Sequence, residues 1–234
     1  MRLVYASALA VALAMVVSPV IGAQDQEAAR KVAGGGISVP GWKGKIDAAA
    51  EKAGQSINDA KFAMEGKALH VTTGPAITYW NPANTATGNY TVKATFTEPK
   101  YMNLNNHPHP YGIVIAGNDM DTAPTYLYCA PYGSGTFIVR GFGPNAFQMN
   151  GGHGEANDAV HKAAAGPGQP VTQDVAVSVK GDKVECAING TVVASYDKSA
   201  LVTAGKLTST DGIYGIRFAH NTDATVTGLT MTKN

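Results

Sequence analysis

The stretch QDVAVSVKGDKVECAINGTVVASY, residues 173–196, consists of three short runs separated by two turn signals. In the first run a valine occupies every second position from Val175 to Val179, so the valines share one face of a strand. Gly-Asp at 181–182 separates the first two runs, and Asn-Gly at 189–190 is the dipeptide most typical of a two-residue hairpin. The stretch therefore predicts a three-stranded antiparallel meander.

The same alternation of apolar and polar residues extends over most of the chain. The 234 residues include 27 Gly and 12 Pro, which suits a fold with many tight turns. A short helix is expected at 47–53, where Asp47 precedes several alanines and Gly54 ends the run. We therefore expect an all-β fold, a two-sheet antiparallel sandwich with a short N-terminal helix or extension. The other expected strands lie at 68–72, 76–80, 89–97, 111–116, 125–130, 135–140, 213–219 and 224–232.

The order and spacing of these runs resembles the concanavalin A-like jelly roll. The resemblance covers residues 41–234 and rests on GKALHV at 66–71, YGIVI at 111–115, the hairpin around 189–190 and the closing run at 212–231. Within that superfamily the chain is most similar to secreted bacterial domains of the 3-keto-disaccharide hydrolase type, many of which have no assigned activity. The resemblance implies a jelly-roll sandwich and names no catalytic residue, because these motifs specify a fold and not a chemistry.

The N-terminal segment is predicted to direct export. Residues 1–23 form an apolar run with a positive start at Arg2 and a small-residue end at Ala23, as in a cleaved signal peptide. The alternative is a membrane anchor, which the small residues and the polar stretch after Ala23 disfavour. We expect a flexible linker at 24–40, the jelly-roll domain at 41–234, no membrane span after cleavage, and a periplasmic or secreted protein.

Charge is scarce in this chain and excludes some functions. Only 15% of residues are charged, with 18 Lys and Arg against 17 Asp and Glu, and removal of residues 1–23 takes away Arg2 alone and leaves 17 against 17. A protein that binds nucleic acid by neutralising phosphates is therefore disfavoured. The six Glu residues, at 27, 51, 65, 98, 155 and 185, include no pair two or four residues apart, as sandwich glucanases place their catalytic carboxylates.

Two clusters have the composition of metal sites. His107 and His109, one residue apart, predict a transition-metal site if the loop bends, with His153 or His161 as a third ligand. The alternative is a proline-stiffened surface loop. The run from Asn118 through Asp119 to Asp121 offers alternate oxygen ligands for Ca²⁺, and its alternative is a turn after a strand. Ca²⁺ is the cofactor that this second run suggests.

Aromatic and planar polar side chains suggest where a sugar would bind, because a sugar ring offers an apolar face and a rim of hydroxyls. If the strands at 125–130, 135–140 and 213–219 share a sheet, some of these side chains line one exposed surface, and the alternatives are core packing for the aromatics and a solvated face for the arginines. By the same alternation, His220 belongs to the core face. The candidate ligand-binding residues are Trp80, Tyr126, Tyr128, Arg140 and Arg217.

The two cysteines, Cys129 and Cys186, both fall within expected strands on faces that read as core. In an oxidising compartment they would form a disulfide that closes a loop of 57 residues, 186 minus 129. Whether their strands touch is not visible in the sequence, so two buried thiols remain the alternative.

Taken together, these features favour an exported β-sandwich protein that binds a glycan or glycoside on a sheet face or at the rim, with no identifiable catalytic machinery. One alternative, a saccharide or glycoside hydrolase or lyase of the 3-keto-disaccharide hydrolase type, rests on the resemblance. The other is an envelope structural or partner-binding protein. The oligomeric state stays open.

Overall fold

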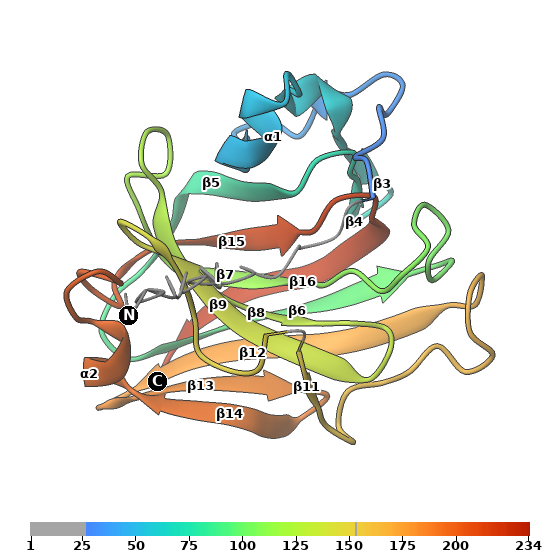
Figure 1. The fold of residues 1–234 in the computed structure, drawn as a ribbon. Coiled ribbons are helices and arrows are strands. Elements are labelled where there is room, and N and C mark those ends of the chain that lie inside the picture. The colour runs from blue at the N-terminus through green and yellow to red at the C-terminus, as the bar shows by residue number, and fades with distance from the viewer. Residues whose placement is uncertain (1–26, 153) are drawn as a thin grey trace, which may run out of the picture.

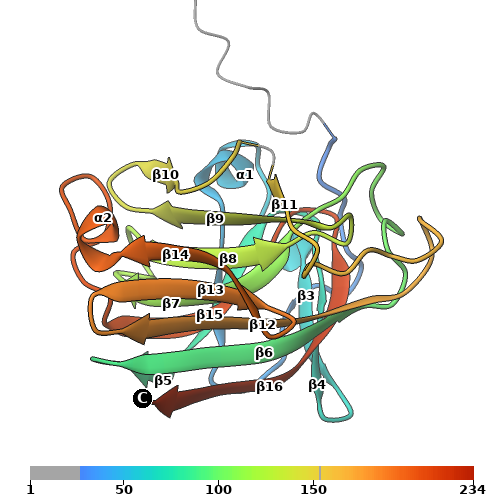
Figure 2. The same ribbon diagram turned by 90° about the horizontal axis from the view of Figure 1, so that it is seen from below.

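The computed structural model describes residues 27–152 and 154–234, and the predicted signal peptide lies outside them. Two curled β-sheets face each other as a sandwich (Figures 1 and 2). The first sheet contains, in spatial order, β1 (Gly36–Ile37), β3 (Lys61–Glu65), β4 (Ala68–Thr72), β16 (Asp223–Lys233), β6 (Tyr90–Glu98), β12 (Val171–Lys180), β13 (Lys183–Ile188) and β14 (Thr191–Asp197). The second contains β10 (Ala146–Gln148), β9 (Thr136–Phe142), β8 (Thr125–Pro131), β7 (Tyr111–Asn118), β15 (Gly212–Phe218), β5 (Ile77–Ala86) and β2 (Lys43–Ile46), with β11 (Glu155–Ala156) beside β9.

The structure confirms the all-β sandwich and the three-stranded meander predicted at residues 173–196. Strands β12, β13 and β14 pair antiparallel in sequence order, with Val177 opposite Cys186. Asn189 and Gly190 form the second turn, with φ angles of 49° and 83°. These left-handed angles at both central residues are what a two-residue hairpin requires and explain the Asn-Gly pair.

The main core lies between the two sheets. Inward side chains of both sheets are buried there, because alternation sends every second residue of a strand to the same face. Cys129 on β8 and Cys186 on β13 meet across this core and form a disulfide, with 6.1 Å between their Cα atoms. The bridge therefore links one sheet to the other, which the sequence had left open.

A second apolar cluster covers the outer face of the second sheet. Its members come from β5, β7, β8 and β9 and, with Met120, from the loop after β7. The cluster is shielded from solvent because the N-terminal part of the chain returns over this face. That part includes α1 (Ala48–Lys52), beside β5 in Figure 1, and the 3-10 turn η1 (Ile57–Asp59). The buried members of the cluster are Trp80, Val114, Met120, Tyr126, Tyr128, Ala130 and Ile138.

The stretch expected to be a linker is packed against the sandwich from residue 27 onward. The backbone N–H of Arg30 donates to Asn221 Oδ1 at 2.8 Å, and Asn221 Nδ2 donates to the carbonyl of Ala28 at 3.2 Å. Further along, β1 pairs with β3 in parallel. No helix among the described residues is long and apolar enough to cross a membrane.

Candidate functional site

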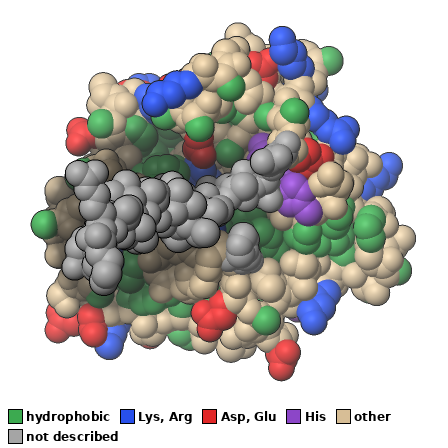
Figure 3. All heavy atoms as spheres, viewed as in Figure 1, with side chains coloured by type: hydrophobic (Ala, Val, Ile, Leu, Met, Phe, Trp, Pro, Cys, Tyr) green, Lys and Arg blue, Asp and Glu red, His purple; other side chains and the backbone are tan. Residues whose placement is uncertain are grey.

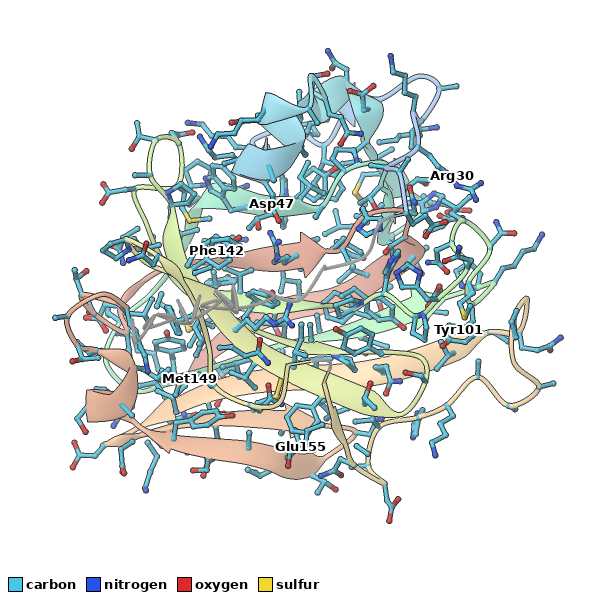
Figure 4. The ribbon with its side chains drawn as sticks, viewed as in Figure 1. Arg30, Asp47, Tyr101, Phe142, Met149 and Glu155 are labelled. Atoms are coloured by element: carbon cyan, nitrogen blue, oxygen red, sulfur yellow. A yellow bond between two sulfur atoms is a disulfide. The ribbon has the colours of Figure 1, made fainter. Side chains whose placement is uncertain are left out.

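The outer face of the second sheet contains a hollow of about 580 Å³. Its floor is formed by β8, β9 and β15, and α1 with the residues around it forms one wall. In Figure 4, Asp47 lies next to α1 and Phe142 at the end of β9. The hollow is thus built from segments at the start, middle and end of the chain.

Arg217 on β15 is the central polar group of this face. Its guanidinium forms a bidentate pair with Asp47, with distances of 2.9 and 2.6 Å, and also donates to the Thr78 hydroxyl at 3.0 Å and the Tyr126 hydroxyl at 2.9 Å. Burial by itself lowers the pKa of Arg217, but the Asp47 carboxylate, Tyr126 and Tyr128 together outweigh burial and hold the pKa well above its ordinary value. Arg217 is therefore a fixed cation.

Asp47 directs its carboxylate to the sheet and not to its own helix. It occupies the N-cap position of α1 and makes no side-chain cap hydrogen bond, although Asp is a favoured capping residue. Both carboxylate oxygens instead accept hydrogen bonds from Arg217. The pair thereby ties α1 to β15, 170 residues further along the chain.

Aromatic rings surround the guanidinium of Arg217. Its carbon lies 5.1 Å from the ring centre of Tyr128, 5.0 Å from that of Phe142 and 6.0 Å from that of Tyr126. Tyr126 lies opposite Phe142 across β8 and β9. Cation–π contacts of this kind are attractive, so the guanidinium and the three rings stabilise one another on the floor of the hollow.

Arg140 differs from Arg217 because it has capacity left for a ligand. It lies on β9 directly opposite Tyr128 and lines the hollow. One terminal nitrogen donates to the carbonyl of Gly152 at 2.5 Å. Its Nε is buried and has no hydrogen-bond partner among the residues that the structure describes. An unpaired buried donor is costly, and the rest of the guanidinium, which carries five N–H donors in all, keeps donors for a ligand in the hollow.

Histidines and a glutamate gather at one end of the hollow. Glu27, His109 and His220 line it, and His107 lies behind them. One ligand atom from each of the four residues lies within 4.8 Å of the others. Figure 3 shows histidine side chains beside acidic ones on this face.

The structure brings four of the five sugar-binding candidates together on one face, and it buries three of these four. Tyr126, Tyr128, Arg140 and Arg217 share the outer face of one sheet, as alternation predicts. The expectation of an exposed surface is wrong for three of them, since Tyr126 is 3%, Tyr128 6% and Arg217 7% exposed. The physical reason is that α1 and the N-terminal segment cover this face.

Trp80 lies on the same outer face but away from the main hollow. It is 2% exposed and lines a second hollow of about 340 Å³, together with Lys45 and Asp121. Its ring packs in the second apolar cluster. It therefore offers no open ring face for stacking.

The Ca²⁺ candidates at the end of β7 point in different directions. Asn118 Nδ2 donates to the carbonyls of Ala116 and Asp211, both at 3.1 Å. Asp121 pairs with Lys43 at 2.8 Å. Asp119 has a φ of 50°, a conformation of turns, which matches the turn interpretation. Ca²⁺ at these residues stays a prediction that the structure does not support.

Among the described residues, the histidine cluster contains His107 and His109 but not His161, one of the two expected third ligands. His161 Nδ1 instead lies 2.8 Å from the carbonyl of Thr172, and His153 lies outside the described residues. The sequence interpretation missed Glu27 and placed His220 in the core. β7 and β15 are paired strands in which Tyr111 lies opposite Phe218, and this pairing brings His220 next to His109. No local sequence signal indicates that these two strands pair.

Comparison with known proteins identifies the fold. No family model and no curated protein matches the sequence. Among solved structures, the carbohydrate binding module CBM66 from Bacillus subtilis has a TM-score of 0.54 at 8% identity, covering 82% of this chain and 96% of that one. A protein of unknown function with a galectin-like fold from Bacillus subtilis has a TM-score of 0.56 at 12% identity, covering 82% and 89%.

A laminarinase from Flavobacterium sp. UMI-01 is similar as well, with a TM-score of 0.50 at 12% identity over 80% of this chain and 90% of that one. At such low identity these likenesses show the fold alone, which is the concanavalin A-like jelly roll. The resemblance to 3-keto-disaccharide hydrolase-type domains is not confirmed by any of them.

Proposed function

We propose that this protein binds a saccharide in the hollow on the outer face of its second sheet. The observation that carries the proposal is Arg140, which lines the hollow with more N–H donors than the one that bonds Gly152, while Tyr128 lies directly opposite it. A saccharide needs both kinds of group, because its ring stacks on aromatic or apolar surface and its hydroxyls accept hydrogen bonds.

The lining of the hollow supports this proposal further. Phe142, Phe147 and Tyr132 add aromatic surface around Arg140, and small residues of α1 keep the opposite wall low. The size, about 580 Å³, falls within the range of roughly 300 to 1,000 Å³ of ligand pockets. Two proteins of the same fold, the carbohydrate binding module and the laminarinase, are named for saccharides.

We propose that binding occurs outside the cytoplasm. Residues 1–23 have the pattern of a cleaved signal peptide. The disulfide between Cys129 and Cys186 fits an oxidising compartment. N-terminal sequencing of the protein recovered from the periplasm or the medium tests this proposal. A chain that still begins at residue 1 would contradict it.

The test of saccharide binding is titration calorimetry against oligosaccharides selected from a glycan array. Arg140→Met removes the donor and keeps much of the apolar stem, so affinity is expected to fall at least about tenfold, the equivalent of 1.4 kcal/mol. Lys93→Met is the matched control, because Lys93 is exposed on β6 in the other sheet.

Three outcomes separate the alternatives. Loss of affinity in Arg140→Met with unchanged affinity in Lys93→Met supports the proposed site. Equal affinity in both variants, or no binding to any saccharide, overturns it. Release of a product from a bound saccharide by the wild type but not by Arg140→Met would show a hydrolase or lyase that uses the same hollow.

A further inference from the structure

We infer that Glu27, His107, His109 and His220 form a binding site for a transition metal ion, with Zn²⁺ as the ion that the donor set suits. The four ligand atoms all lie within 4.8 Å of one another, although they come from three separate parts of the chain. This inference does not depend on saccharide binding, because it rests on these four side chains and on the residues that hold them.

The distances between the imidazoles suit a shared ion. His107 Nε2 and His109 Nε2 are 2.8 Å apart. With Zn–N bonds of 2.0–2.1 Å, tetrahedral geometry separates two nitrogen ligands by about 3.3 Å. The two rings therefore need to part by about 0.5 Å, and the proton that His109 Nε2 donates to His107 must leave, to admit the ion. The rings of His109 and His220 are also neighbours, with 4.1 Å between their centres.

The proton on His107 lies where a metal ligand needs it. Its Nδ1 is 2.5 Å from Asn106 Oδ1. A carboxamide oxygen only accepts hydrogen bonds, so Nδ1 carries the proton and Nε2 presents its lone pair toward His109. Metal-binding histidines almost always donate their other N–H to such an acceptor, which orients the ring.

Glu27 supplies the acidic ligand of the site. Its side chain is 15% exposed, and Oε2 is buried with no hydrogen-bond partner among the described residues. This oxygen lies 3.7 Å from His107 Nδ1, which is too long for a hydrogen bond. A buried carboxylate oxygen without hydrogen bonds is unfavourable, and a cation at this position would offset that cost.

Two asparagines, Asn221 and Asn105, hold the site together. Asn221 follows His220 directly, is fully buried, and bonds through its side chain to the backbone of Ala28 and Arg30, next to Glu27. Asn105 donates to the carbonyl of Asn221 at 3.0 Å and contacts His109 Nδ1 at 3.1 Å. All three segments of the cluster are thereby joined before an ion binds.

The donor set selects the class of ion. Three imidazoles and one carboxylate suit Zn²⁺, Cu²⁺ or Ni²⁺, whereas Ca²⁺ and Mg²⁺ require mainly oxygen ligands. Because Glu27, His109 and His220 also line the hollow, a bound ion would be reached from it.

The experiment uses the full protein without a histidine tag, stripped of metal by a chelator and titrated with Zn²⁺. The expected result is binding of one Zn²⁺ ion per chain and a higher unfolding temperature. When Co²⁺ replaces Zn²⁺, we expect the visible absorption bands of a Co²⁺ ion with few ligands. His220→Gln and Glu27→Gln are each expected to weaken Zn²⁺ binding at least tenfold. His161→Gln is the control, since that histidine is exposed and lies outside the cluster.

Circular dichroism verifies that each variant is folded, and Glu27→Gln keeps the test valid if a histidine variant does not fold. Equal Zn²⁺ affinity in the cluster variants and the wild type overturns the inference, and so does binding of far less than one ion per chain. In either case the four residues form a hydrogen-bonded cluster only.

Discussion

Replacement of Glu98 by Gln is expected to stabilise the protein at pH 8 and to have little effect at pH 4. Glu98 is the last residue of β6 and is 3% exposed. One carboxyl oxygen accepts a hydrogen bond from the Met102 N–H at 3.1 Å. The other is buried without a partner among the described residues, so the charged form is poorly solvated there.

The magnitude follows from the pKa of this carboxyl. Burial raises the pKa of Glu98 from 4.5 to about 7, the Met102 N–H opposes the rise, and the Asp223 carboxylate adds to it. The folded protein therefore holds this proton more tightly than the unfolded chain does. The resulting stability is fully present below pH 4.5 and is lost as the pH rises through 7. At 1.36 kcal/mol per pKa unit, the loss at pH 8 is about 3 kcal/mol.

The glutamine side chain carries no titratable proton, so the Glu98→Gln variant should escape this loss. Urea unfolding at pH 4, 6 and 8, with the disulfide intact, measures the free energy of unfolding of both proteins. Subtraction of one pH profile from the other removes the contribution of the histidines. The difference is expected to grow by about 3 kcal/mol in favour of the variant between pH 4 and pH 8.

Glu155→Gln serves as the matched control, because Glu155 is exposed on β11 and its replacement should change the free energy of unfolding by less than about 0.5 kcal/mol at any pH. A difference profile for Glu98→Gln that is flat between pH 4 and pH 8 would refute the reasoning. A variant less stable than the wild type at pH 8 would refute it as well.

Three further changes test the packing around the site. The double change Cys129→Ala and Cys186→Ala should lower the free energy of unfolding by about 4 kcal/mol in denaturant titrations, and reductant should have no further effect on it. Asp47→Asn should cost about 3 kcal/mol in the same assay, because Arg217 keeps a buried charge without its counterion, and addition of Arg217→Met should recover part of this. Gly112→Ala should lower the melting temperature, since the new methyl group would overlap the Cys129 carbonyl; an unchanged temperature would contradict that contact.

Much of the fold could be predicted because its signals are local. The valines at 175–179 and the Asn189-Gly190 turn indicate the meander without knowledge of any distant residue. The same alternation placed Tyr126, Tyr128, Arg140 and Arg217 on one face on the condition that their strands share a sheet, which the structure shows. Alternation indicates which residues share a face, but not what covers that face.

The burial of Arg217 illustrates the difference. Its partner Asp47 is 170 residues away in the sequence and occupies the N-cap position of a helix of five residues. Nothing near either residue predicts that they meet. Without α1 over the sheet, the arginine and its tyrosines would form an exposed face; with it, they form the floor of a hollow.

The all-β sandwich, the meander and the position of His107 and His109 in one loop could be predicted from the sequence. The tertiary structure was needed to show that the strands of Tyr126, Tyr128, Arg140 and Arg217 share a sheet, that His220 and Glu27 join the two histidines, and that α1 forms one wall of the hollow. The reason is physical: strand alternation and turns depend on neighbouring residues, whereas the pairing of β7 with β15 and the return of the N-terminal segment depend on contacts across the whole chain.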